Sequence, residues 1–318
     1  MIKKAYLLIA IMAMLAMFSG CKDSTDPPED SAFDILVEYM EANSMDLSDI
    51  TNAWIIDASV VAANPDSYYI MDIRSQGDYD TLGHIDGAIH SSLSTVVTDA
   101  AASGSLPIVV TCYTGQSAGH AVVALRLSGY PNAKSLKFGM SAWNSVFDKW
   151  TSSTGNIADG HANWVTTATA TPATFDYPEI TSTATSGSAI LAERVEAMVT
   201  GGFKGVNSSD VLETPTNYFI NNYWPETAVT QYGHIDGAYR INEDLTLEND
   251  GFKHFDPSQT IVTYCWTGQT SSVVTAYLTV LGYDATSLKF GVNSMIYDDL
   301  ESSKWSASGD YPYVVTTP

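Results

Sequence analysis

The chain is poor in cysteine and in basic residues. Its 318 residues include three cysteines (Cys21, Cys112 and Cys265), and 14 lysines and arginines stand against 36 aspartates and glutamates. Three cysteines exclude a scaffold built on disulfides. The formal net charge of −22 leaves no basic footprint for phosphates, so we expect no nucleic-acid partner. An anionic ligand must be held by local geometry, because the overall field of the chain does not attract it.

The chain also lacks a hydrophobic run that would span a bilayer comfortably. Its most apolar stretch, residues 5–18, follows Lys3 and Lys4 and runs into Phe-Ser-Gly-Cys at 18–21, an order typical of an export signal. Residues 18–21 resemble the lipobox of bacterial lipoproteins, whose cysteine carries the lipid. The resemblance implies a signal peptide at 1–20, a lipid anchor on Cys21 and a tether at 21–32. We therefore expect an extracytoplasmic protein, periplasmic or on the cell surface, that meets the membrane through this anchor alone; a plain secretory signal is the alternative.

The rest of the chain is an internal repeat. Several motifs recur in the same order about 150 residues apart, which indicates duplication of a whole domain. We predict one domain at 33–167 and another at 188–318, joined by a Thr/Ala/Pro-rich linker at 168–187. The motifs are Gly-His-Ile-Asp-Gly-Ala at 83–88 and 233–238, Cys-aromatic-Thr-Gly-Gln at 112–116 and 265–269, and Ser-Leu-Lys-Phe-Gly at 135–139 and 287–291.

Each copy predicts an α/β fold. In the first, residues 68–73 are rich in β-formers, and the unbroken apolar run at 107–111 is typical of a strand buried on both faces of a parallel sheet. Residues 117–128 have helical spacing and end before a glycine. We therefore expect a parallel sheet with helices on both faces in each domain. The corresponding ranges in the second copy are 217–223, 260–264 and 271–281.

A cysteine between a buried strand and the start of a helix lies where main-chain N–H groups converge. These groups and the helix dipole stabilise an anion, so Cys112 and Cys265 are candidate nucleophiles. A glycine three residues after each cysteine permits a tight turn, and Ser117 and Thr270 are the predicted N-caps. The loop residues predicted to surround a negatively charged sulfur, or a sulfur atom added to it, are Tyr113, Thr114, Gly115, Gln116 and Ser117 in the first copy and Trp266, Thr267, Gly268, Gln269 and Thr270 in the second.

The order strand, Cys-x-x-Gly-x-[Ser/Thr], helix, preceded by Asp72-x-Arg74 and by the Gly-His-Ile-Asp-Gly-Ala turn, resembles the rhodanese family of sulfurtransferases in its two-domain form. The resemblance implies a five-stranded parallel sheet per domain and a catalytic role for Cys112 and Cys265. It also implies a persulfide reaction, in which a cysteine takes sulfur from thiosulfate or another donor and a thiol or cyanide removes it. No cofactor is expected, and no metal, since no cysteine or histidine cluster has ligand spacing.

Two features depart from the pattern. Neither loop carries a basic residue, and we predict that Lys137 and Lys289, which occupy the same place in the two Ser-Leu-Lys-Phe-Gly motifs, supply the cation for an anionic donor. The second copy has Asn-Tyr-Trp at 222–224 where the first has Asp-Ile-Arg at 72–74. This difference favours Cys112 as the better supported nucleophile.

The histidines receive structural roles. His84 and His234 belong to the repeated turn, where we expect local hydrogen bonds. His120 is matched by Val273 in the other copy. A catalytic partner of the cysteine would have been duplicated with it, so we expect His120 on the surface of its helix.

Two other functions share part of this pattern. Cysteine phosphatases need an arginine six residues after the cysteine to grip phosphate, and Ala118 and Ser271 stand there, so that chemistry is not expected. A sulfur or selenium carrier without turnover, or a redox-sensing module, stays open, because exposed thiolates oxidise readily outside the cytoplasm. The donor, the acceptor and the more active cysteine also stay open.

Overall fold

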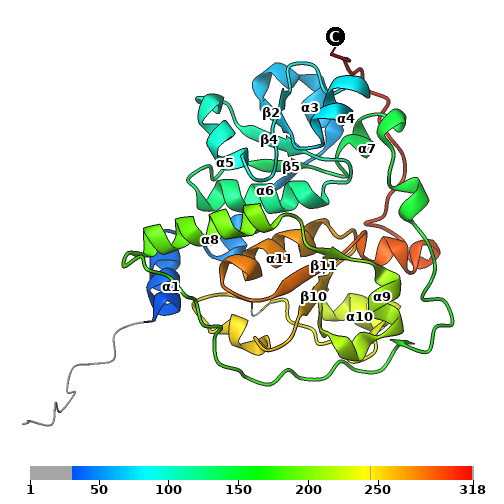
Figure 1. Ribbon diagram of the computed structural model, residues 1–318. Coiled ribbons are helices and arrows are strands. Elements are labelled where there is room, and N and C mark those ends of the chain that lie inside the picture. The colour runs from blue at the N-terminus through cyan, green and yellow to red at the C-terminus, as the bar shows by residue number, and fades with distance from the viewer. Residues whose placement is uncertain (1–30, 244, 317–318) are drawn as a thin grey trace, which may run out of the picture. The chain divides into compact units, whose positions relative to one another are not determined.

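Two parallel sheets form the frame of the described chain (Figure 1). The structure is a computed structural model that describes residues 31–243 and 245–316. The first sheet has the strand order β1-β5-β4-β2-β3, and the second has the order β7-β11-β10-β8, with all pairs parallel. The first sheet has the expected five strands, but the second has four, and an isolated bridge between Asn221 and Tyr239 stands in for the fifth.

The main strands and helices follow one another in a similar order in both copies, although the described part of the second copy has no α-helix in the places of α5 and α7. The strands are β1 (Ile55–Ile56), β2 (Tyr69–Asp72), β3 (Ile89–His90), β4 (Ile108–Thr111), β5 (Lys134–Leu136), β6 (Trp164–Val165), β7 (Gly205–Val206), β8 (Phe219–Asn222), β9 (His234–Ile235), β10 (Ile261–Tyr264) and β11 (Ala285–Leu288). The helices are α1 (Ala32–Ala42), α2 (Leu47–Thr51), α3 (Ala58–Ala63), α4 (Gln76–Thr81), α5 (Val96–Asp99), α6 (Gln116–Leu127), α7 (Met140–Trp143), α8 (Gly187–Gly201), α9 (Ser208–Glu213), α10 (Glu226–Tyr232) and α11 (Gln269–Val280).

Helices cover both faces of each sheet. In the first sheet, Ile70 and Val109 pack with α3 and α7, whereas their neighbours Met71 and Val110 pack on the opposite face with α5 and α6. In the second sheet, α9 and α10 share a core with one face, and α8 and α11 cover the other. This alternation follows from the two-residue period of a strand. The predicted α/β class, with two parallel sheets between helices, is confirmed.

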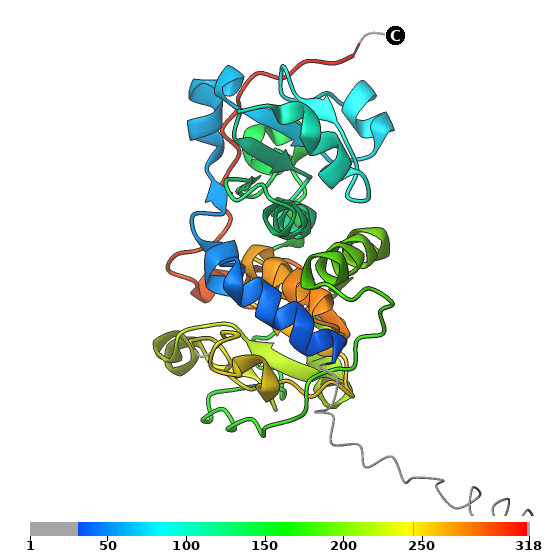
Figure 2. The same cartoon turned by 90° about the vertical axis from the view of Figure 1, so that its left-hand side faces the viewer.

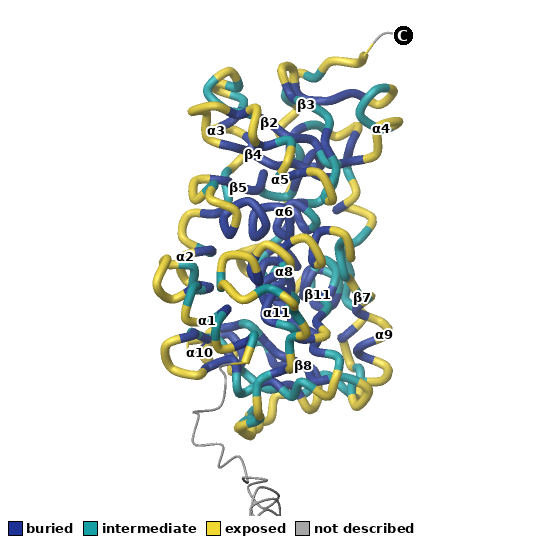
Figure 3. The backbone as a smooth tube through the Cα atoms, turned by 60° about the vertical axis from the view of Figure 1, so that its left-hand side comes forward, coloured by how far each residue is buried: buried dark blue, intermediate teal, exposed yellow. Residues whose placement is uncertain are grey.

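The helices that follow the two cysteine loops pack against each other. The described residues from Ser31 onward form one compact unit, and a single buried core includes side chains of α6, α8 and α11. Figure 3 shows α6 and α11 largely in the colour of buried residues. In α6 every residue except Ser117 is buried. Close approach is possible because Gly119 has no side chain, and a Cβ there would lie 3.3 Å from the carbonyl oxygen of Gln269 and on the Ser272 hydroxyl. The contact brings the beginnings of the two helices, and the loops that precede them, together.

The C-terminal segment of each copy pairs with the other copy. At the end of the first copy, β6 forms an antiparallel ladder with β9, in which Val165 lies opposite His234. At the end of the second, Val314 and His84 exchange main-chain hydrogen bonds of 2.8 and 2.9 Å. Figure 2 shows this red terminal segment running beside the blue and cyan elements of the first copy. The repeated Gly-His-Ile turn is therefore covered each time by a segment from the other half of the chain.

The chain enters the structure through a capped helix. Ser31 and Asp34 form a capping box at the start of α1, so this helix begins at the end of the predicted tether. Phe33 stacks on Tyr177, with ring centroids 4.2 Å apart. The predicted signal peptide and Cys21 lie outside the described residues. Within the described part of the chain, no helix has the length and apolar character that crossing a membrane requires.

Candidate functional site

Each cysteine lies between a central strand and a long helix. Cys112 follows the last residue of β4, and Cys265 follows the last residue of β10. In both copies the helix begins four residues after the cysteine, as α6 and α11. The cysteines therefore lie at the carboxyl edges of their parallel sheets, where ligands bind in open α/β folds.

The turn into each helix depends on a glycine. Gly115 and Gly268 have φ values of +80° and +73° and occupy the N-cap positions. Glycine adopts this left-handed conformation without the strain that a Cβ would bring. The predicted N-caps Ser117 and Thr270 lie inside the first helical turn, so that prediction is wrong.

A main-chain amide points at each sulfur. The N–H of Gly115 donates to Cys112 Sγ at 3.2 Å, and the N–H of Ser271 donates to Cys265 Sγ at 3.3 Å. Both are free cysteines whose side chains are almost covered, at 6% and 2% exposure. The donor in the first copy is the glycine of the turn, whereas the donor in the second copy is Ser271, in the first turn of α11. Either arrangement stabilises negative charge on the sulfur.

The Ser-Leu-Lys-Phe-Gly motifs support the loops from the neighbouring strands. The N–H of Met140 donates to the Cys112 carbonyl at 2.7 Å, and that of Val292 donates to the Cys265 carbonyl at 3.1 Å. The residue that precedes each of these donors is a glycine with positive φ, packed directly against the loop backbone. These supporting residues were missed by the sequence analysis, although the repetition of the motif was the available signal. The two glycines are Gly139 and Gly291.

The loop glutamines do not face the sulfurs. Gln116 Oε1 accepts the N–H of Phe290 at 2.9 Å, and Gln269 Oε1 accepts the N–H of Phe138 at 2.7 Å. Each glutamine thus reaches from its own loop to the supporting motif of the other copy. The Nε2 group of each donates to the threonine two residues earlier, at 3.1 and 3.0 Å. The side chains of this predicted sulfur-binding pair join the two loops instead.

Aromatic rings fill the space between the two loops. Phe138 lies edge-on to Trp150 at 5.0 Å and to Trp305 at 5.3 Å, and Phe290 lies edge-on to Trp150 at 5.0 Å. The indole N–H of Trp150 donates to the carbonyl of Thr114 at 3.2 Å. The first loop is therefore held by side chains from outside the cysteine motif, and no local pattern of residues predicts these contacts.

The predicted lysines have other surroundings. Lys137 pairs with Asp57 at 3.3 Å, on a side chain that is 44% exposed. Within residues 31–243 and 245–316, neither Lys137 nor Lys289 hydrogen-bonds to a cysteine loop through its ammonium group. A lysine that the sequence analysis missed lies beside the first loop: Lys149 Nζ is 5.3 Å from the ring centroid of Tyr113. The role of Lys137 and Lys289 in binding an anionic donor stays a prediction.

A buried ion pair supports the first loop. Arg74 binds Asp72 at 2.6 Å, both side chains being at most 1% exposed, and also donates to the Gly83 carbonyl at 2.6 Å. Its guanidinium lies 5.1 Å from the ring centroid of Tyr113, the residue after Cys112. Burial acts to lower the pKa of Arg74, but hydrogen bonds and attraction to Asp72 outweigh it, so the pKa is raised and the group stays charged.

The second copy replaces this ion pair with neutral side chains. Asn222 stands in place of Asp72, and Trp224 in place of Arg74. Trp224 stacks against Trp266, the residue after Cys265, with ring centroids 4.3 Å apart. Both polar atoms of the Asn222 side chain and the Trp224 indole nitrogen are buried without a hydrogen-bond partner among the described residues. The second loop is therefore supported by contacts between aromatic rings in place of an ion pair.

The histidines are structural. His84 stacks on Tyr79 at 3.7 Å, and His234 Nε2 lies 2.7 Å from the Thr167 carbonyl of the exchanged segment. His120 was expected on the helix surface, and that prediction is wrong. It is 1% exposed and lies edge-on to Phe203, and burial lowers its pKa to about 3, so it is neutral. The missed signal is that α6 carries almost no charge, which is typical of a helix buried on all sides.

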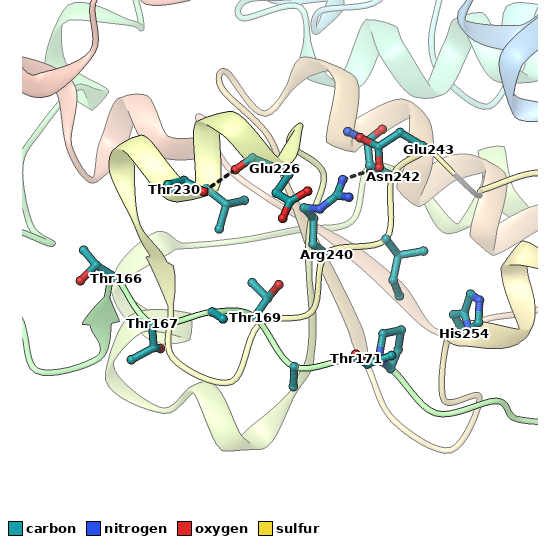
Figure 4. Close-up of a pocket in the computed structure, with 15 residues that line it drawn as sticks. Thr166, Thr167, Thr169, Thr171, Glu226, Thr230, Arg240, Asn242, Glu243 and His254 are labelled. Atoms are coloured by element: carbon teal, nitrogen blue, oxygen red, sulfur yellow. Dashed lines mark hydrogen bonds and ion pairs between the residues drawn. The ribbon is translucent and has the colours of Figure 1, made fainter.

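A separate polar cavity lies beside the second sheet (Figure 4). It has a volume of about 580 Å³ and is lined by neither cysteine. Arg240 and Glu243 form an ion pair at its wall, and Arg240 also donates to the Trp224 carbonyl. Through this hydrogen bond, Arg240 links the wall of the cavity to Trp224, which follows the end of β8. Of the described residues, no three or more His, Cys, Asp and Glu side chains cluster as metal ligands would.

Comparison with known proteins agrees with this geometry. The family described as Rhodanese-like domain matches residues 56–146 and 212–296. Among curated proteins, the thiosulfate sulfurtransferase GlpE of Pseudomonas paraeruginosa is 38% identical over 84 residues, which cover 26% of this chain and 76% of that protein. GlpE of Pseudomonas aeruginosa is 35% identical over 85 residues, with 26% and 76% covered.

Solved structures are similar at lower identity. The Alr3790 protein from Anabaena sp. is 29% identical, with 28% of this chain and 74% of that chain covered and a TM-score of 0.26. A thiosulfate sulfurtransferase from Pseudomonas aeruginosa is 16% identical, with 87% and 48% covered and a TM-score of 0.31. The family match covers more than half of the chain and includes both cysteine loops. The chain belongs to the rhodanese-like sulfurtransferase family and carries two copies of its domain.

Proposed function

We propose that the chain transfers sulfane sulfur from thiosulfate or a related donor to a thiol or cyanide, through a persulfide on Cys112, Cys265 or both. The observation that carries this proposal is the main-chain N–H directed at each Sγ where a central strand ends. A sulfur anion held there needs no charged side chain, because the amides and the helix dipole stabilise it.

The proposed reaction has two balanced steps. The cysteine thiolate attacks the outer sulfur of thiosulfate; a Cys–S–S bond forms, the sulfur–sulfur bond of thiosulfate breaks, and sulfite leaves with its electron pair. Cyanide or a thiolate then attacks the terminal sulfur. This breaks the new sulfur–sulfur bond, releases thiocyanate or the acceptor persulfide, and restores the thiolate. No external oxidant or reductant is consumed.

The loop residues have distinct parts in this proposal. Main-chain N–H groups of residues 113–117 and 266–270 stabilise the bound sulfur, whereas the glutamine side chains hold the two loops together. Persulfides carried by neutral or protein-borne donors fit these loops well, because neither loop carries a charged side chain. Lys149 lies beside the first loop and is, with Lys137, a candidate cation for a dianionic donor there.

Turnover separates this function from that of a carrier. We expect the purified protein to form thiocyanate from thiosulfate and cyanide, and the Cys112→Ala/Cys265→Ala double variant to lose this activity, because no nucleophile is left to carry the sulfur. Comparison with each single variant assigns the activity to one site or to both. A wild-type protein that forms persulfide but no thiocyanate would favour the carrier without turnover, and a double variant with full activity would contradict the proposal.

We also propose that Cys21 anchors the protein by a lipid outside the cytoplasm. We expect the full-length chain to incorporate labelled palmitate in a bacterial host and to partition into detergent. The Cys21→Ala variant should lose both properties, because the acceptor of the lipid is removed. Cys112→Ala is the control and should keep the label. Labelling of Cys21→Ala at the level of the unchanged chain would contradict the anchor.

A further inference from the structure

Tyr223 is one of the side chains in which the two sulfur sites differ. Another is Ser271, whose hydroxyl lies 3.6 Å from Cys265 Sγ and whose place is taken by Ala118 in the first copy. In parallel strands, residues at the same register lie next to each other. β8 pairs with β10 so that Asn222 lies opposite Tyr264, and the N–H of Tyr223 donates to the Tyr264 carbonyl at 2.9 Å. The next residues along the two chains, Tyr223 and Cys265, therefore lie side by side at the edge of the sheet.

Side-chain packing puts Tyr223 and Cys265 on the same face of the sheet. Trp224 and Trp266, one residue further on, stack against each other in the core on the opposite face. Tyr223 packs instead against the core that contains α11. Cys265 Sγ accepts its hydrogen bond from Ser271, in the first turn of the same helix. The phenol and the sulfur thus share the space between the strand ends and α11.

The Tyr223 hydroxyl is a donor without an assigned acceptor. Its side chain is half-buried, and its hydroxyl forms no hydrogen bond with any residue in the described ranges. Burial, followed by the nearby charges of Cys265 and Glu243, raises the pKa of Tyr223 to about 12, so the phenol keeps its proton at neutral pH. The charged groups that face it are these two, and Glu243 is itself paired with Arg240.

We propose that the Tyr223 hydroxyl donates a hydrogen bond to the negatively charged sulfur at Cys265, whether thiolate or terminal persulfide. Tyr223 is then a positioning residue that gives the second site a donor in addition to the Ser271 amide. The first copy lacks it, because Ile73 occupies the matching place and makes the same main-chain bond, to the Thr111 carbonyl at 2.9 Å. The persulfide part of this proposal rests on the proposed function, whereas the thiolate part does not.

The test measures the rate of iodoacetamide alkylation against pH, with Cys112 and Cys265 quantified separately by peptide mass spectrometry of the whole chain. We expect Tyr223→Phe to move the midpoint of the Cys265 profile up by about one pH unit, because one hydrogen bond to a charged sulfur is lost. The Cys112 profile should stay in place. The converse change, Ile73→Tyr, should move the Cys112 midpoint down and leave Cys265 alone.

The outcomes distinguish this inference from the proposed function. An unchanged Cys265 midpoint in Tyr223→Phe, or an equal shift at both cysteines, would overturn the inference. Tyr223→Ile, which copies the residue of the first site, provides a second variant and should shift Cys265 in the same direction. Alkylation measures the thiolate without any sulfur donor, so its result does not depend on persulfide formation. If the Cys265 midpoint shifts as expected but the protein never forms persulfide, the hydrogen bond is supported and the proposed function fails.

Discussion

Gly139→Ala should suppress persulfide formation on Cys112 by about 100-fold or more while Cys265 keeps its reactivity. Gly139 has φ +61° and ψ −152°, a conformation that is essentially restricted to glycine. A Cβ there would meet the Cys112 carbonyl and would lie 2.7 Å from the main-chain nitrogens of Thr114 and Gly115. These atoms belong to the backbone of the loop, so the loop itself must move and the Gly115 amide turns away from the sulfur.

Two further variants make this result specific. Gly291→Ala creates the same conflict with the Cys265 carbonyl and should silence Cys265 alone. Gly129→Ala introduces a side chain at φ +95°, but into open space at the other end of α6, and controls for backbone strain without a clash. Persulfide on each cysteine is measured by mass spectrometry after incubation with thiosulfate. Equal persulfide on Cys112 in Gly139→Ala and in the unchanged chain would contradict the described support of the loop.

Arg74→Met should lower the free energy of unfolding by about 3–5 kcal/mol, because it leaves the Asp72 carboxylate buried without its partner. The lost hydrogen bond to Gly83 adds to this effect. The measurement is urea denaturation followed by tryptophan fluorescence. Since the guanidinium also lies beside the Tyr113 ring, reactivity at Cys112 should fall more than at Cys265.

The second copy supplies the matched control for Arg74. The double variant Asp72→Asn/Arg74→Trp reproduces the neutral pair Asn222 and Trp224, so no charge remains buried without a partner. It should therefore lose less stability than Arg74→Met does. If the double variant and Arg74→Met lost the same free energy of unfolding, an unpaired Asp72 carboxylate would not explain the loss in Arg74→Met.

The repeat made the fold accessible from the sequence. Apolar runs ending in cysteine, followed by helical spacing, predicted β4 with α6 and β10 with α11, and each pair is present. These predictions succeed because a strand or a helix is determined largely by residues that are close together in the sequence. The ion pair between Asp72 and Arg74 was equally local, since its members are two positions apart in the sequence.

The contacts between the copies could not be predicted in the same way. Gln116 and Gln269 were predicted as loop residues that hold the sulfur through main-chain N–H groups. The partners of their side chains, which lie in the other copy more than 130 positions away, could not be predicted from the loop. The low charge of α6 indicates that the helix is buried, but α6 viewed alone does not reveal that α8 and α11 pack against it. The exchange of C-terminal segments is likewise a property of the assembled halves.

The central claim is that main-chain amides at two sheet edges hold a reactive sulfur on each cysteine. Mass spectrometry of the chain after incubation with thiosulfate, with Cys112→Ala and Cys265→Ala analysed beside it, tests this claim most directly. The account predicts that a loop cysteine gains one sulfur atom that cyanide removes, and the two single variants show whether Cys112, Cys265 or both carry it. Unmodified loop cysteines in all three proteins would contradict the account.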